Sequence, residues 1–161
     1  MAVIIFVLLL WYGCLFFQSF FLHRYAAHQV FTMSKTMERI TFILTWVFQG
    51  SSYLSAYGYG IMHRMHHAYT DTEKDPHSPS HDANLFAMMW KTKTIYHDIN
   101  EQRIEVDQRF IKNVPQWKSF DQIASSNLSR IFWILSYFLF FLLFVTSWWQ
   151  WLFFPITFLM A

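Results

Sequence analysis

Charged side chains are confined to the middle of this chain, and their distribution restricts the fold more than any other feature. All 12 Lys and Arg residues and all 10 Asp and Glu residues lie between Arg24 and Arg130. The flanking stretches 1–23 and 131–161 are apolar, and each reaches the length of about 20 residues that a helix needs to cross a bilayer. The sequence therefore predicts an all-α integral membrane protein with a charged helical cap outside the bilayer.

The first apolar stretch predicts a transmembrane helix over residues 2–22. Arg24, Lys35 and Arg39 follow this helix closely, and an excess of Lys and Arg marks the cytoplasmic end of a span. We therefore expect the largely polar segment 63–130 on the cytoplasmic side. The net charge is only +2 and no basic run is present, so nucleic-acid binding is not expected.

The second apolar stretch, 131–161, predicts a transmembrane hairpin. Its first helix is expected to end near Val145, and aromatic residues typical of a membrane interface follow. A second helix is expected to begin at Leu152, but it has too few residues to span a bilayer. We therefore expect residues 1–161 to form a single domain that is incomplete at its C-terminus.

Histidines gather in two short segments of the chain. His63, His66 and His67 are spaced i, i+3 and i+4, so on a helix they fall within an arc of about 100° and share one face. His23 and His28 are five residues apart, which is about 140° on a regular α-helix. Either the helix breaks or widens between them, or the two imidazoles serve two neighbouring metal ions. The remaining alternative is that they are two unrelated surface histidines beside the lipid headgroups.

Residues 38–62 are apolar enough in part to suggest a further span. A true crossing would place the second histidine segment about 30 Å from the first, on the opposite side of the bilayer. We therefore expect 38–62 to be helical structure that enters the bilayer or lies along its surface without crossing. The alternative is a true span with two unrelated histidine segments.

Five imidazoles without a cysteine partner suit iron, zinc or copper. The single cysteine, Cys14, lies inside the first apolar stretch and excludes both an intramolecular disulfide and a cysteine-rich zinc site. No His-Glu-x-x-His pattern is present, so a zinc protease of that type is not supported.

Other polar residues near these segments are candidates for supporting roles. Asp71 and Asp75 follow the triple-histidine segment, and metal-bound imidazoles commonly donate their second N–H group to a carboxylate. Gln49, Tyr53 and Tyr57 precede that segment and are candidates for lining a substrate tunnel, although packing against neighbouring helices is the favoured explanation for each.

The two histidine segments resemble the histidine boxes of the membrane fatty acid desaturase family. His-Arg-Tyr-Ala-Ala-His at 23–28 is similar to the first box, HRxxxH, and His-Arg-Met-His-His at 63–67 is similar to the second, HRxHH. Asp-Pro-His at 75–77 resembles the tripeptide that follows the second box in the Δ9 acyl-CoA branch. The overall likeness is to short bacterial members, which implies a multi-pass protein of the bacterial inner membrane.

The resemblance implies an enzyme with a non-haem diiron centre. Its two irons activate O₂ so that two hydrogens are removed from adjacent methylenes of an acyl chain, leaving a cis double bond, with Δ9 suggested by Asp-Pro-His. The substrate would be carried on CoA, a phospholipid or acyl carrier protein, and a ferredoxin, rubredoxin or cytochrome b5 type donor would supply electrons. The implied iron ligands are His23, His28, His63, His66 and His67.

The sequence departs from the family pattern in its ligand number. Family members carry a third box, HxxHH, and an Asn-x-x-x-His element, and neither is present here. Five imidazoles cannot give two irons four or more ligands each, so we expect this chain to be an inactive fragment of a longer desaturase. The alternatives are a related membrane diiron hydroxylase, which would form an alcohol, and a non-catalytic truncated membrane protein.

Overall fold

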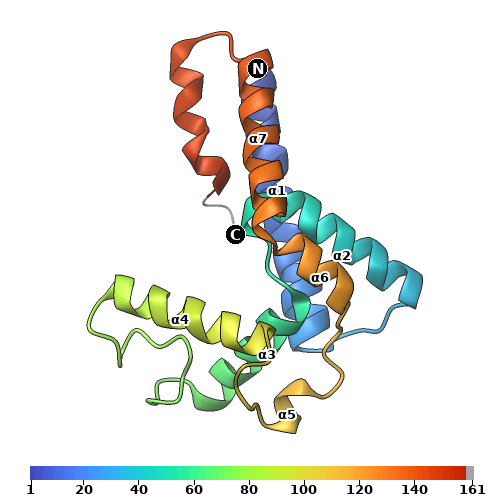
Figure 1. Ribbon diagram of the computed structural model, residues 1–161, viewed down its shortest axis with the longest axis vertical. Coiled ribbons are helices and arrows are strands. Elements are labelled where there is room, and N and C mark those ends of the chain that lie inside the picture. Colours follow the sequence, from blue (N-terminus) through green and yellow to red (C-terminus); the bar gives the residue numbers. More distant parts are fainter. Residues whose placement is uncertain (159–161) are drawn as a thin grey trace. The chain divides into compact units, whose positions relative to one another are not determined.

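Long apolar runs without proline favour helices, and the computed structural model, which describes residues 1–158, contains helices and no strand over that range (Figure 1). The all-α prediction is therefore confirmed for the described residues. Two helices among them are long and apolar enough to cross a membrane, Ala2–Ala27 and Asn127–Phe144. Both coincide with the apolar ends of the sequence.

The first helix has two parts with different hydrogen bonding. It begins as α1, Ala2–Phe17, and continues as the π-helix η1, Gln18–Ala27. A π-helix bonds each N–H group to the carbonyl five residues earlier, and such segments are rare and often functional. The continuous helix therefore runs five residues beyond the predicted end at residue 22 and carries His23 within it.

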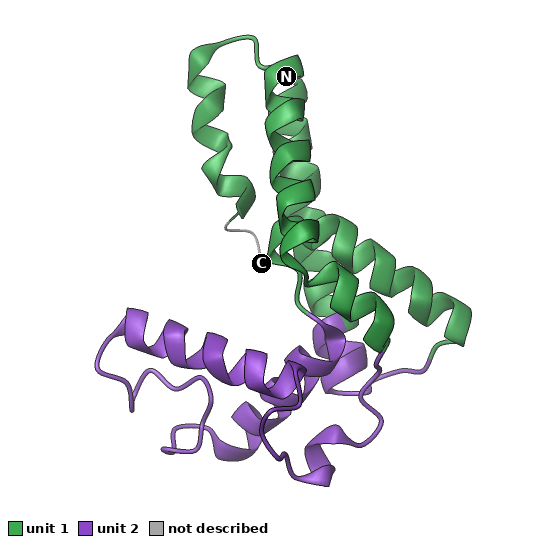
Figure 2. Cartoon of the chain, in the orientation of Figure 1, with its two compact units in different colours: residues 1–21, 33–54, 117–161 green, residues 22–32, 55–116 purple. Residues whose placement is uncertain are grey.

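The chain divides into two compact units, shown in green and purple in Figure 2. Unit 1 contains residues 1–21, 33–54 and the chain from Trp117 on. Besides α1 it holds six described elements: α2, Lys35–Gln49; η2, Gly50–Ser52; α6, Lys118–Ala124; α7, Asn127–Phe144; and the 3₁₀-helices η3, Trp148–Phe153, and η4, Pro155–Phe158.

Aromatic and aliphatic side chains form the core of unit 1. Val3 and Val7 of α1 pack with Phe141 of α7, and all three are buried. At η2 the backbone passes so close to α7 that a Cβ on Gly50 would lie 1.7 Å from the Tyr137 hydroxyl, and Gly50 has a φ of +56°. Only glycine fits this close approach and this backbone conformation.

Unit 2 contains residues 22–32 and 55–116, and it therefore includes both histidine segments. Its helices are α3, Ala56–Tyr69, α4, Leu85–Asn100, and the short α5, Gln108–Ile111. Ser55 caps α3 by accepting a hydrogen bond from the Gly58 N–H at 3.0 Å. The core of the unit is a cluster of Tyr57, Ile61, Ile99 and Phe110.

The end of the described chain differs from the predicted transmembrane hairpin. Where an α-helix was expected to begin at Leu152, the structure has the two short 3₁₀-helices η3 and η4. Pro155 has no N–H group and its ring clashes with a preceding helical turn, so it interrupts α-helical hydrogen bonding. The last residues of that expected helix, 159–161, lie outside the described residues.

Candidate metal centre

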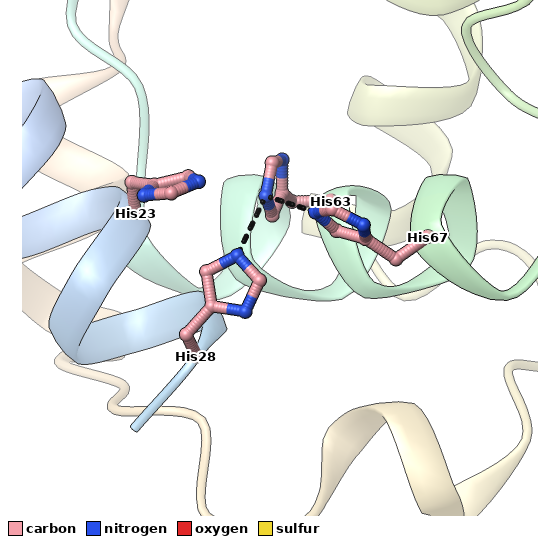
Figure 3. A group of neighbouring side chains, drawn as sticks. All are labelled: His23, His28, His63 and His67. Atoms are coloured by element: carbon pink, nitrogen blue, oxygen red, sulfur yellow. Dashed lines mark hydrogen bonds between the residues drawn. The ribbon is translucent and has the colours of Figure 1, made fainter. Parts of the chain in front are cut away.

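Four histidine side chains of unit 2 converge on one point. The cluster consists of His23 and His28 from the end of the first helix and His63 and His67 from α3 (Figure 3). One ligand nitrogen from each ring lies within 4.8 Å of the others. The two predicted histidine segments therefore meet, although 34 residues separate them in the sequence.

The π-helix explains how His23 and His28 reach the same point. The His28 N–H donates to the His23 carbonyl at 3.0 Å, which is the five-residue hydrogen bond of a π-turn. Residues five apart therefore lie one turn apart on the same side, and the two ring centroids are 4.5 Å apart. Of the alternatives that the sequence left open, the structure has the widened helix.

Regular α-helical spacing supplies the other half of the cluster. His63 and His67 are one turn apart on α3, and their Nε2 atoms are 3.0 Å apart. The His28 Nε2 atom lies 3.1 Å from the His63 Nε2 atom. Two imidazoles on one tetrahedral ion, with metal–nitrogen bonds of about 2.0–2.1 Å, place their nitrogens roughly 3.3 Å apart. The nitrogens of the cluster are thus close to the spacing of ligands on a shared ion.

Electrostatics keep part of this cluster neutral, which is the state that binds a metal. Burial, and then the neighbouring imidazoles, lower the pKa of His63 to about 4. Burial also lowers the pKa of His28, together with the charges of His23, His67 and Arg64. A neutral ring offers a nitrogen lone pair, so these two imidazoles are available as donors at neutral pH.

Arg64 connects the two histidine segments through hydrogen bonds, a role that the sequence analysis did not assign to it. Its guanidinium donates to the carbonyls of Ala26 and Ala27, at 2.9 and 2.6 Å, directly before His28. It also donates to the carbonyls of Phe110 and Lys112, at 3.0 and 2.7 Å. The position of Arg64 within His-Arg-x-His-His could have indicated this role, because among the side chains only arginine presents five N–H donors in a fixed fork.

A close backbone approach also brings the segments together. A Cβ on Gly60 of α3 would lie 3.2 Å from the Ala26 carbonyl oxygen and 3.1 Å from Val114. These distances are tighter than ordinary contacts, so glycine lets α3 lie directly against the end of the first helix.

His66 lies beside the cluster and has a different partner. Its Nδ1 atom is 2.8 Å from Oδ1 of Asp75, whose side chain is fully buried. Burial raises the pKa of Asp75. The hydrogen bonds from the His66 ring and from the His77 and Asp71 backbone together outweigh this effect, so the pKa lies below its ordinary value. Of the two carboxylates suggested as imidazole partners, that of Asp75 contacts a histidine ring, whereas that of Asp71 contacts the Ser80 hydroxyl at 3.4 Å.

The three residues suggested for an acyl tunnel are all buried, but they have separate surroundings. Tyr57 belongs to the apolar core of unit 2. In unit 1, the Gln49 side-chain carbonyl accepts from the Leu54 N–H at 3.0 Å, and the Tyr53 hydroxyl donates to Asp121 at 2.7 Å. Burial raises the pKa of Asp121 to about 6, despite the hydrogen bond from Tyr53.

An apolar groove of about 680 Å³ lies elsewhere in unit 1. It is lined by eight residues, nearly all of them apolar: Leu9, Tyr12, Gly13, Leu15, Phe16, Phe17, Ser19 and Phe48. Its walls suit a hydrocarbon chain, and none of the three suggested tunnel residues lines it.

The donor set fits a transition metal. Imidazole nitrogen suits iron, zinc and copper, and four such nitrogens at this spacing can surround one ion. The hydrogen bond from His66 to Asp75 is the kind of outer contact that orients a histidine ligand and fixes its tautomer. The structure therefore defines a helical chain with two apolar helices of membrane-spanning length and a cluster of four histidines whose geometry suits a metal ion.

Comparison with known proteins identifies the family. The model of the fatty acid desaturase family matches residues 1–161, so the chain belongs to that family. Its similar relatives include the Hex-5-enoyl-[acyl-carrier protein] acetylenase of Moorena producens (strain JHB), which is 42% identical over 59 residues. The match covers 37% of this chain and 17% of that relative. No solved structure matches the chain.

Proposed function

We propose that this chain provides the first two histidine segments of an O₂-dependent fatty acyl desaturase. Family membership and the acetylenase relative support fatty acyl desaturation as the general activity. The observation that carries the proposal is the convergence of His23, His28, His63 and His67, because these residues come from the two segments that resemble the histidine boxes.

The histidines of unit 2 are proposed to hold the metal, and their neighbours to orient them. Iron bound at such a site supplies the activation of O₂ that removal of hydrogen from an unactivated methylene requires. His63 and His28 offer neutral nitrogens, Asp75 holds one N–H group of His66, and Arg64 keeps the two segments in register.

The proposed reaction balances with an external electron donor. Two hydrogens leave adjacent methylenes of the acyl chain, two electrons come from the donor and two protons come from the solvent, so that O₂ is reduced to two molecules of water. A cis double bond, with Δ9 as the proposed position, remains in the product. A ferredoxin, rubredoxin or cytochrome b5 type protein is the proposed donor.

A second iron requires ligands beyond the five histidines of the two boxes. The proposed diiron centre therefore belongs to the whole enzyme, of which residues 1–161 supply His23, His28, His63, His66 and His67. The whole enzyme is proposed to be a multi-pass protein of a bacterial inner membrane, with the histidines on the cytoplasmic side. The two apolar helices of the chain support a membrane location.

The acyl carrier is proposed to be acyl carrier protein, with CoA and phospholipid as the alternatives. Support comes from the name of the Moorena relative, which specifies an enoyl chain on acyl carrier protein. The same name makes acetylenase activity, the conversion of a double bond to a triple bond, the second candidate function. The apolar groove along α1 is a candidate contact for the hydrocarbon chain.

Product analysis with a deuterated acyl chain tests the proposal. Membranes from cells expressing residues 1–161, or the complete open reading frame, are supplied with the labelled fatty acid, and the lipids are analysed by mass spectrometry. We expect the complete reading frame to give an alkene that has lost deuterium from two adjacent carbons, and residues 1–161 alone to give none. An alcohol would support the hydroxylase alternative, an alkyne from an enoyl precursor would support acetylenase activity, and no product from the complete reading frame would contradict an enzymatic role.

A further inference from the structure

The helix α4 of unit 2 carries an exposed apolar face at its N-terminal end. Leu85, Phe86, Met89 and Trp90 are 63%, 81%, 57% and 70% exposed. At 100° per residue these four positions fall within an arc of about 140°, so their side chains form one continuous surface over the first two turns. Large apolar side chains that gather on one exposed face mark a surface that binds a partner.

The opposite face of α4 packs the helix into unit 2. Met88, Tyr96 and Ile99 are buried, and Ile99 belongs to the core cluster of the unit. The Tyr96 hydroxyl also accepts a hydrogen bond from the Ser55 N–H at 2.7 Å. The contacts that hold α4 therefore come from this other face, and the apolar face remains available to a partner.

The charges along α4 match a lipid surface with anionic headgroups. Between Ala83 and His97 the only Asp, Glu, Lys or Arg residues are Lys91 and Lys93, and both are cationic. The Lys93 Nζ atom lies 5.2 Å from the centroid of the Trp90 ring. Tryptophan is enriched where headgroups meet hydrocarbon, and lysine can rest its methylenes on apolar surface while its ammonium reaches the headgroups. Apolar and aromatic residues beside lysine are typical of a helix bound at a membrane interface.

The other end of α4 carries the charges that suit water. Asp98 and Glu101 pair with Arg103, and the Arg103 side chain is largely exposed. Glu101 lies about 22 Å from Phe86 along the helix axis, at 1.5 Å per residue. The headgroup region is only roughly 5–8 Å thick on each side of a bilayer. A tilted helix therefore places its apolar first turns in lipid and its charged end in water.

We propose that the apolar face of α4 inserts into the surface of a bilayer that contains anionic phospholipid. The first two turns enter the lipid, Lys93 contacts the lipid phosphate groups, and the end at Glu101 stays in water. The inference goes beyond the proposed function, because it assigns a lipid-binding surface outside the histidine cluster.

Spin labels on single cysteines test the insertion, with a readout that is independent of catalysis. The 161-residue chain contains one cysteine, Cys14, so Cys14→Ala provides a background without a native thiol. Phe86→Cys, Glu101→Cys and Leu139→Cys are each labelled in this background and reconstituted into vesicles of phosphatidylcholine and phosphatidylglycerol. Collisions of the label with O₂, which concentrates in hydrocarbon, and with a water-soluble nickel chelate are then measured. Circular dichroism verifies the helix content of each variant.

We expect the label at Phe86 to collide with O₂ in preference to the nickel chelate, and the label at Glu101 to show the reverse preference. The ratio of the two collision rates should be several-fold higher at Phe86 than at Glu101. A label at Phe86 that meets the nickel chelate as readily as the label at Glu101 would overturn the inference. A label at Phe86 that meets neither reagent would also overturn it, because a second copy or another protein would then cover the face.

The role of Lys93 is tested by comparing these vesicles with vesicles of phosphatidylcholine alone. Phosphatidylglycerol should raise the collision ratio of the label at Phe86, and Lys93→Gln should remove most of that rise. Lys74→Gln is the matched control, because Lys74 is exposed in the loop after α3 and lies outside α4. It should keep the rise, and an equal rise in Lys93→Gln would overturn the assignment of anionic headgroups to Lys93.

The label at Leu139 separates this inference from the proposed membrane location. Leu139 is exposed on α7, one of the two helices of membrane-spanning length. A label at Leu139 in lipid together with a label at Phe86 in water would overturn the insertion of α4 alone. A label at Leu139 in water would contradict the membrane location, whereas lipid contact at Phe86 would still support the insertion.

Discussion

Replacement of Arg64 by alanine tests how the two histidine segments are held together. The guanidinium donates four hydrogen bonds to backbone carbonyls, two at the end of the first helix and two at Phe110 and Lys112. A hydrogen bond from a charged donor contributes about 1.5–3 kcal/mol when buried, and roughly 1 kcal/mol each is reasonable here because water can replace the donor at the exposed carbonyls. We therefore expect Arg64→Ala to lower the free energy of unfolding by about 3–4 kcal/mol.

The same substitution should weaken metal binding. Without the contacts to Ala26 and Ala27, the adjacent His28 is free to move away from His63, and loss of an orienting contact commonly lowers metal affinity about 10–100-fold. Arg64→Lys should fall between the wild type and Arg64→Ala, since an ammonium keeps the charge but lacks the fork that reaches several carbonyls.

Isothermal titration with Zn²⁺ and denaturant unfolding of the purified chain measure the two effects. Arg103→Ala is the matched control, because Arg103 is mostly exposed and its partners are the side chains of Asp98 and Glu101. The control should change the free energy of unfolding by less than about 1 kcal/mol and leave Zn²⁺ affinity unchanged. If Arg64→Ala bound Zn²⁺ as tightly as Arg103→Ala, the assigned role of Arg64 would be refuted.

Three further substitutions test other contacts. Asp75→Asn should lower metal affinity about 10-fold, because it weakens the hydrogen bond that orients His66. The pKa of Asp75 in the folded state is below its ordinary value of 3.8, so the stability that its carboxylate contributes is lost as pH falls through that folded pKa. Acid unfolding curves of Asp75→Asn should lack this loss of stability. The pKa of Asp121 is raised from 3.8 to about 6, so the wild type should lose stability as pH rises between those values, whereas Asp121→Asn should not. Parallel pH–stability curves for the two proteins would contradict a raised pKa at Asp121. Gly60→Val should destabilise unit 2 by about 1–3 kcal/mol in denaturant unfolding, since its side chain would overlap the Ala26 carbonyl, and a wild-type transition would refute that close approach.

The helical fold could be predicted because its signals are local. Uncharged apolar ends indicated the helices α1 and α7, and the i, i+3, i+4 spacing placed His63, His66 and His67 on one helix. The ends of the helices were harder to predict from the sequence. The first helix continues past residue 22 as a π-helix, because residues 23–27 contain neither proline nor glycine, whereas Pro155 replaces an expected α-helix by 3₁₀ turns.

The kinds of residue that form the site could be predicted from the sequence, but the residues that contact those histidines could not. The five-residue spacing of His23 and His28 fitted a widened helix and two separate metal ions equally well, and only the π-turn hydrogen bond distinguishes these. Thr92 is 15 residues from His77 in the sequence, and its contact depends on how the loop after α3 folds back on α4. No local pattern encodes such a contact, so neither the contact between Thr92 and His77 nor the four hydrogen bonds of Arg64 could be derived beforehand.

Iron content after purification is the measurement that tests the central claim most directly. The protein is expressed in membranes from its complete open reading frame, purified without added metal, and analysed by plasma mass spectrometry together with His63→Ala and His97→Ala. His63 is at the centre of the cluster, in contact with His28 and His67, whereas His97 lies on α4 and belongs to no histidine cluster among the described residues. We expect iron in the wild type and in His97→Ala and a loss of most of it in His63→Ala. Equal iron in all three proteins, or none in the folded wild type, would contradict a metal site built from the two histidine segments.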